Sequence, residues 1–143
     1  MQEAGRNVSC WAPLIAGASG GRIDLQIQME QMSGYLAARF IGVAAPGEGL
    51  QQFELIAEHC KLTNNDRLLI DGTGFTIIQP QTLDKFFMGE RLVIFMRYGI
   101  KVAFVTRPER IDLLKFAILV AQNRGVKVEA FTDYQSAEEW LLK

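Results

Sequence analysis

Apolar and polar side chains alternate strictly over residues 23–30, so every second side chain falls on the same face of an extended chain. This pattern predicts a strand with one buried and one solvated face. Residues 35–41 have the aromatic and aliphatic content of a second strand, and the short turn at 31–34 contains Gly34. The chain is therefore expected to open with an antiparallel hairpin.

After the break at 45–47 the apolar residues take the period of a helix. The residues that follow the i, i+3, i+4, i+7 spacing of one helical face are Phe53, Ile56, Ala57 and Cys60. This face is expected to lie against the sheet.

Two compact apolar runs, 67–71 and 101–106, are typical of strands that are covered on both faces. The first is expected to be a central strand. A glycine-containing loop is predicted at 72–80, followed by a long helix at 82–98 with Gly99 as its C-cap.

The last part of the chain predicts a helix, a strand and a helix. Pro108 stands at the favoured first position of a helix that runs to Asn123 or Arg124. Residues 126–130 alternate as an edge strand, and Asp133 or Ser136 is expected to cap a final amphipathic helix.

The element order is therefore β-β-α-β-α-β-α-β-α, which predicts one α/β domain over 23–143. Its mixed sheet would begin with the antiparallel hairpin and continue with parallel strands, joined by right-handed crossovers, with four helices on the faces. Residues 1–22 are rich in glycine and alanine and are expected to form a poorly ordered leader.

Composition narrows the range of partners. The 143 residues carry a formal net charge of −1 and no basic run, which argues against a nucleic-acid partner. No apolar run reaches the roughly 18 residues of a transmembrane span, and the short apolar run in the leader lacks the positive flank of a signal peptide. A cytoplasmic protein with two free thiols, Cys10 and Cys60, is expected.

The sequence around Asp71 partly matches a catalytic motif. Asp-x-Asp-Gly-Thr after a buried strand is typical of haloacid-dehalogenase-type phosphatases, but Leu69 stands where the nucleophilic carboxylate is required. The glycines at 72 and 74 lack the further residues of a dinucleotide loop or a P-loop. With His59 as the only histidine, we expect no catalytic site, metal or cofactor; Asp71, Thr73 and Arg107 are the nearest polar candidates for an unfamiliar activity.

The second and third predicted helices carry more apolar side chains than one sheet face can cover. Three explanations remain open. The excess is a surface for a homodimer or another protein, it lines an apolar pocket, or the leader and the other helices bury it.

A resemblance to a known family rests on three segments, which are Leu68-Leu69-Ile70-Asp71, Val102-Ala103-Phe104-Val105, and Val128-Glu129-Ala130-Phe131 with the Trp140-Leu141 ending. With the element order, they resemble the SpoIIAA-like branch of the STAS superfamily, the anti-sigma-factor antagonist domains. The likeness covers residues 23–143. It implies a bacterial, cytoplasmic, non-enzymatic regulatory module that binds a protein partner.

The resemblance also implies a binding surface after the central strand. In the antagonist domains a serine there is phosphorylated, but here Pro80 stands at or near that place, so Thr76 and Thr82 are the possible phosphorylation sites. The expected partner-binding residues are Asp71, Thr73, Phe75, Thr76, Gln79, Thr82 and Phe87. Because the superfamily also resembles Sec14-type lipid carriers, an apolar small molecule is the alternative ligand.

Overall fold

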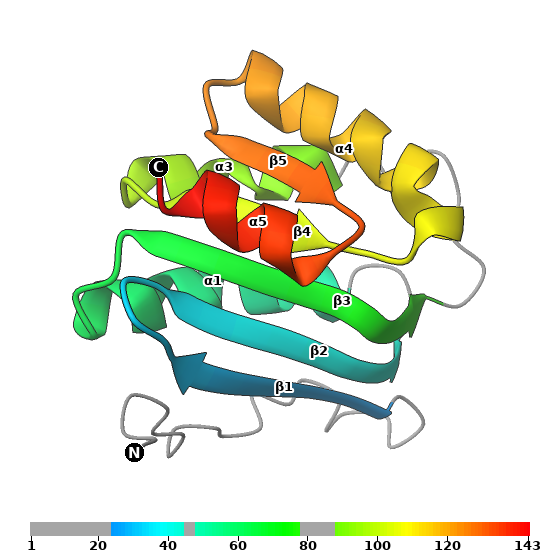
Figure 1. Cartoon of the computed structure of the whole chain (residues 1–143), viewed down its shortest axis with the longest axis horizontal. Coiled ribbons are helices and arrows are strands. Elements are labelled where there is room, and N and C mark those ends of the chain that lie inside the picture. The colour runs from blue at the N-terminus through cyan, green and yellow to red at the C-terminus, as the bar shows by residue number, and fades with distance from the viewer. Residues whose placement is uncertain (1–23, 45–47, 78–87) are drawn as a thin grey trace.

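The computed structural model describes residues 24–44, 48–77 and 88–143 of the chain. Five strands form one sheet in the order β1-β2-β3-β4-β5 (Figure 1). The first pair is antiparallel and the other three pairs are parallel. The strands are β1 (Asp24–Gln31), β2 (Leu36–Ala44), β3 (Arg67–Ile77), β4 (Lys101–Val105) and β5 (Val128–Phe131).

Helices connect the parallel strands and close the chain. Within the described residues these are α1 (Glu48–Leu62), α3 (Val93–Arg97), the short 3-10 helix η4 (Pro108–Arg110), α4 (Ile111–Asn123) and α5 (Tyr134–Leu141). The predicted α/β class, the mixed sheet and the order of its elements are confirmed.

The strand order explains how the helices are distributed over the sheet. From β2 to β5 each strand lies beside the one before it, so successive right-handed crossovers place their helices on the same face. One apolar core accordingly joins the sheet to α1, α3 and α4. A second, smaller core lies on the opposite face, where Ala137 and Leu141 of α5 cover Leu69 and Val105.

The apolar faces of the first strand and the first helix lie as the sequence predicts. Leu25, Ile27 and Met29 of β1 are buried, whereas Gln26 between them is exposed. The α1 face predicted to pack on the sheet, from Phe53 to Cys60, is buried as well.

Glycine ends two of the helices in the same way. Gly99 follows α3 with φ +70°, and Gly125 follows α4 with φ +96°. In both turns the residue after the glycine donates its N–H to a carbonyl five residues back, from Ile100 to Phe95 and from Val126 to Ala121. In each turn this bond satisfies one of the last carbonyls of the helix, and the positive φ favours glycine.

Three predicted boundaries need correction or completion. The predicted loop at 72–80 is wrong over its first part, because β3 continues to Ile77 in register with β2. The helix predicted from Pro108 begins with the 3-10 turn η4. Of the helix predicted at 82–98, the described residues 88–97 are helical except at Leu92, and the rest lies outside the described residues.

Asp133 is the residue that caps the last helix. Its carboxylate accepts a hydrogen bond from the backbone N–H of Ser136 at 2.9 Å. This contact lowers the pKa of Asp133, because the bond favours the charged form. The sequence left Asp133 and Ser136 open as the capping residue. Asp133 is the cap, and Ser136 supplies the backbone N–H that the cap accepts.

Candidate functional site

The candidate site lies where β3 runs past the end of β4. Asp71 is the last β3 residue that pairs with β4, opposite Val105, whereas β3 continues along β2 as far as Ile77. The backbone beyond Asp71 therefore has a free edge on the β4 side, where polar side chains can reach it.

An irregularity in β3 sets which side chains face this site. Arg39 pairs with Asp71 and Ile41 with Gly74, so two β3 residues oppose Phe40 alone. An extra residue reverses the alternation of side chains between the two faces. Phe75 consequently turns into the large core, with its ring centroid 5.6 Å from that of Phe40, and Thr76 lies on the α5 side.

Asp71 is held by its own neighbours. Its Oδ1 accepts hydrogen bonds from the backbone N–H of Thr73 at 3.0 Å and from the Thr73 hydroxyl at 2.7 Å. Its Oδ2 lies 3.8 Å from Nε of Arg39. The Asp71 carboxylate therefore bonds the backbone and the side chain of Thr73 within β3.

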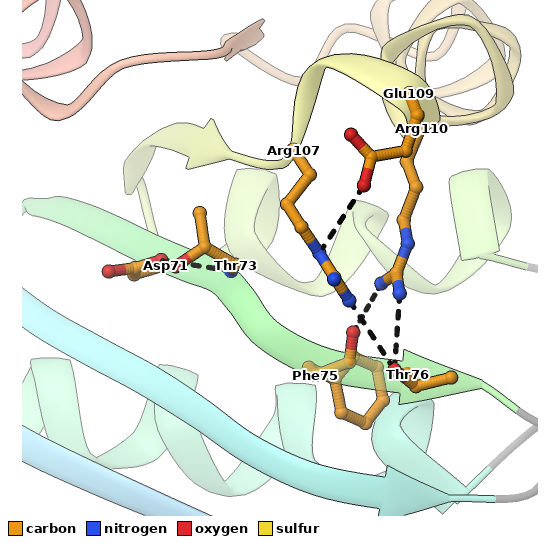
Figure 2. A network of polar contacts seen from close by, with 7 residues as sticks. All are labelled: Asp71, Thr73, Phe75, Thr76, Arg107, Glu109 and Arg110. Carbon is orange, nitrogen blue, oxygen red and sulfur yellow. Dashed lines mark hydrogen bonds and ion pairs between the residues drawn. The ribbon is translucent and has the colours of Figure 1, made fainter.

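Two arginines converge on Thr76 from the segment after β4 (Figure 2). Nη2 of Arg110 donates to the Thr76 hydroxyl oxygen at 3.1 Å, and Nη2 of Arg107 approaches the same oxygen at 3.5 Å. Arg110 also donates from Nη1 to the carbonyl oxygen of Phe75. Arg110 thus bonds the free edge of β3 where β4 no longer does.

The charges at this point do not balance. Burial lowers the pKa of Arg110, and the positive charge of Arg107 lowers it further. The negative charge of Glu109 opposes this lowering of the Arg110 pKa. The Oε2 atom of Glu109 lies 3.9 Å from Nε of Arg107, which is too far for a hydrogen bond. Nε of Arg107 is buried and has no hydrogen-bond partner among the described residues.

The predicted partner-binding residues are only partly described. Asp71, Thr73 and Thr76 are polar residues of the extended end of β3, and the half-buried Phe75 packs into the core between them. The other predicted positions, Gln79, Thr82 and Phe87, lie outside the described residues, as does the leader at 1–22. Whether any of these residues binds a partner stays a prediction.

The arginine pair is the feature that the sequence interpretation missed. Arg107 was noted only as a polar candidate, and Arg110 was not singled out. The signal was the segment Arg107-Pro108-Glu109-Arg110 directly after a buried strand, at the carboxyl end of a parallel sheet, where ligands of such folds bind.

An apolar row lies on the outer side of α4. Leu113, Phe116 and Leu119 are 44%, 42% and 54% exposed. The helix buries Ala117, Ile118 and Ala121 on the side that faces the sheet. The three exposed residues are spaced i, i+3, i+6, which places them together on one face of α4. The predicted apolar excess of the third helix is therefore partly on the surface.

A hollow of about 220 Å³ lies between α1 and the helical segment 88–97. Its apolar walls are Phe53, Val93 and Ile94, and its charged walls are Glu54, Glu90, Arg91 and Arg97. Pockets for small ligands usually begin at about 300 Å³ and are mostly apolar. The hollow therefore gives no support to a lipid-like ligand.

Two kinds of feature are absent from the described part of the chain. Among the described residues, no three or more histidine, cysteine or acidic side chains gather closely enough to hold a metal ion. Over the same residues, no helix combines the length and the apolar character that crossing a membrane requires.

Comparisons with known proteins found similarity among solved structures alone. Protein-family models and curated proteins gave no match. Among solved structures, the chain is similar to an uncharacterised protein of the DUF3478 family from Shewanella loihica PV-4, described as having a SpoIIAA-like fold. The two are 22% identical, the match covers 87% of this chain and 99% of that one, and the TM-score is 0.49.

Proposed function

We propose that this chain is a non-catalytic, cytoplasmic regulatory module that binds protein, of the kind found in anti-sigma-factor antagonist domains, and that it forms a homodimer through α4. The observation that carries the proposal is the exposed row Leu113, Phe116 and Leu119. Three large apolar side chains in one row on a surface helix favour a protein contact over solvent.

A second copy of the chain is the partner that this row fits best. The row is symmetric in sequence, because Leu113 and Leu119 stand three residues before and after Phe116. A twofold axis through Phe116 would place Leu113 of one copy against Leu119 of the other. Such an isologous contact is the commonest way in which soluble proteins pair.

The polar groups support a binding role over a catalytic one. Asp71, the single acid of the partial phosphatase motif, is engaged by Thr73 and Arg39. Leu69 stands two residues before Asp71, where the motif requires the nucleophile, and it is buried. Leucine cannot attack phosphorus, and the one remaining carboxylate cannot serve as both nucleophile and general acid.

Light scattering coupled to size-exclusion chromatography tests the dimer. We expect the full-length protein to elute with twice the mass of one chain, and Phe116→Glu to elute as a monomer because its charge would be buried in the contact. Leu55→Glu is the matched control, since Leu55 is 44% exposed, close to the 42% of Phe116, but lies on α1. It should leave the dimer intact, and all three proteins should have the same circular dichroism spectrum.

A wild-type protein that stays monomeric at millimolar concentration contradicts the homodimer. If Leu55→Glu dissociates the protein and Phe116→Glu does not, the contact lies on α1 and the role assigned to α4 is wrong.

A further inference from the structure

We propose that Arg107 and Arg110 form a binding site for a phosphate group carried as a monoester, with the Thr76 hydroxyl as a third ligand. The site lies on the α5 side of the sheet, at the free edge of β3, and it does not depend on the homodimer proposed above. The argument rests on geometry, on unequal use of the two arginines and on charge.

The geometry brings two guanidinium groups to one point. Both approach the Thr76 oxygen with an Nη2 nitrogen, at 3.1 Å for Arg110 and 3.5 Å for Arg107. Thr76 is exposed, so the point is open to solvent. Figure 2 shows the two side chains descending side by side from the segment after β4 to the end of β3.

The two arginines are not used in the same way. Arg110 has a structural role, because it bonds both the Phe75 carbonyl and the Thr76 hydroxyl. Among the described residues, Arg107 has the 3.5 Å contact with Thr76 and the 3.9 Å contact with Glu109. Both distances are too long for strong hydrogen bonds. The guanidinium group of Arg107 therefore keeps N–H donors that no described residue engages strongly.

The local charge favours an anion. Two guanidinium groups share this point and Glu109 is the one carboxylate in contact with either, which leaves an excess of one positive charge among the described residues. Asp71 is paired with Arg39 of β2 and accepts a hydrogen bond from Thr73 of its own strand. A bound anion would relieve the repulsion between Arg107 and Arg110, which burial of Arg110 strengthens.

A phosphate monoester fits the donors better than a carboxylate does. Each guanidinium group offers parallel N–H donors that match two oxygens, and the Thr76 hydroxyl can turn its proton to a third. A phosphate monoester presents three terminal oxygens and close to two negative charges at neutral pH, whereas a carboxylate presents two oxygens and one charge.

Nuclear magnetic resonance titration of the full chain with inorganic phosphate, O-phosphoserine and acetate tests the site. We expect saturable shifts centred on Thr76 and Arg107 for both phosphate compounds and weak, unsaturated shifts for acetate. Arg107→Gln should weaken phosphate binding by about tenfold, which corresponds to loss of one charge-assisted contact. Arg107→Lys should recover part of the affinity, because lysine restores the positive charge but not the paired N–H donors of a guanidinium group.

Arg97→Gln is the matched control. It removes one exposed arginine charge on α3 and should change phosphate affinity by less than about twofold. Arg110→Gln is avoided as the main variant because it removes a bond to the β3 backbone. A phosphoserine peptide that binds more tightly than O-phosphoserine identifies a phosphorylated protein as the source of the group, and equal affinities identify a small phosphate ester.

The proposal is overturned if phosphate does not saturate the wild-type protein, if acetate binds as tightly as phosphate, or if Arg107→Gln and Arg97→Gln weaken binding equally. Light scattering on the same variants separates this result from the homodimer, since loss of phosphate binding with an unchanged mass leaves the dimer proposal standing.

Discussion

The side chain of Cys60 shows how strongly one residue can depend on its surroundings. Cys60 is fully buried on the sheet side of α1, and burial raises the pKa of its thiol from 9.0 to about 12. Burial has this effect because a thiolate loses its hydration in an apolar core. At pH 8 only about one thiol in ten thousand is therefore ionised in the folded protein.

We expect Cys60 to resist thiol reagents until the protein unfolds. In a Cys10→Ser variant, which leaves Cys60 as the single thiol, maleimide labelling at pH 8 should be slow in buffer and fast in guanidinium. Stability should not depend on this thiol below pH 9, where it is protonated in both states. Between pH 9 and 12 the free energy of unfolding should fall, because only the unfolded chain loses the proton. Fast labelling of the native variant would show that α1 opens.

At the scale of elements, the period of the apolar residues predicted most of the fold. The α1 face from Phe53 to Cys60 is buried as its spacing indicates, and the buried runs at 67–71 and 101–106 correspond to β3 and β4. Such patterns are local, so the sequence carries them directly. The length of β3 is a different matter. Gly72 and Gly74 signal a loop, but β3 continues through both, and Gly74 pairs with Ile41 of β2.

The arginine pair could not be predicted for a related reason. Arg107 and Arg110 lie 31 and 34 positions from Thr76 in the chain. They meet Thr76 only because β4 ends at Val105 while β3 continues, and because the irregularity opposite Phe40 turns Thr76 to the α5 side. Both conditions depend on strand pairing, which no local pattern specifies.

Gly89 lies where the helical segment 88–97 packs tightly against α4. A Cβ atom at this position would lie 2.6 Å from Cβ of Val120 and 2.7 Å from the carbonyl oxygen of Ala117 on α4. We expect Gly89→Ala to lower the free energy of unfolding by about 1–3 kcal/mol, although alanine normally favours a helix. Urea denaturation measures this change. A stabilised Gly89→Ala variant would mean that the two segments separate easily.

At the scale of the whole molecule, α5 contacts a residue that lies far from it in the sequence. The hydroxyl of Tyr35, the residue before β2, donates to Glu138 of α5 at 2.7 Å, across 103 positions of sequence. Since its one proton is used there, the Tyr134 hydroxyl is the donor in the 2.9 Å contact with Tyr35. Burial and these two partners raise the pKa of Tyr35, so it stays protonated.

Removing this hydroxyl should loosen α5. Tyr35→Phe leaves Glu138 and Tyr134 without their shared partner, and we expect it to lower the free energy of unfolding by about 1–3 kcal/mol. Tyr98→Phe, which removes the same group from a half-buried ring beside α3, is the control and should change stability less. Hydrogen exchange should accelerate in α5 before it does in α1. Equal exchange in both helices would show that the contact does not hold α5 in place.

The order of the strands has a consequence for how the molecule is made. Every strand pairs with the one that precedes it in the chain, so during synthesis each strand leaves the ribosome beside an edge that already exists. The sheet can thus lengthen in one direction, from the hairpin to β5, without waiting for a distant partner. The face under α5 has to wait longer, because Leu69 and Val105 stay uncovered until the residues of α5 have left the ribosome.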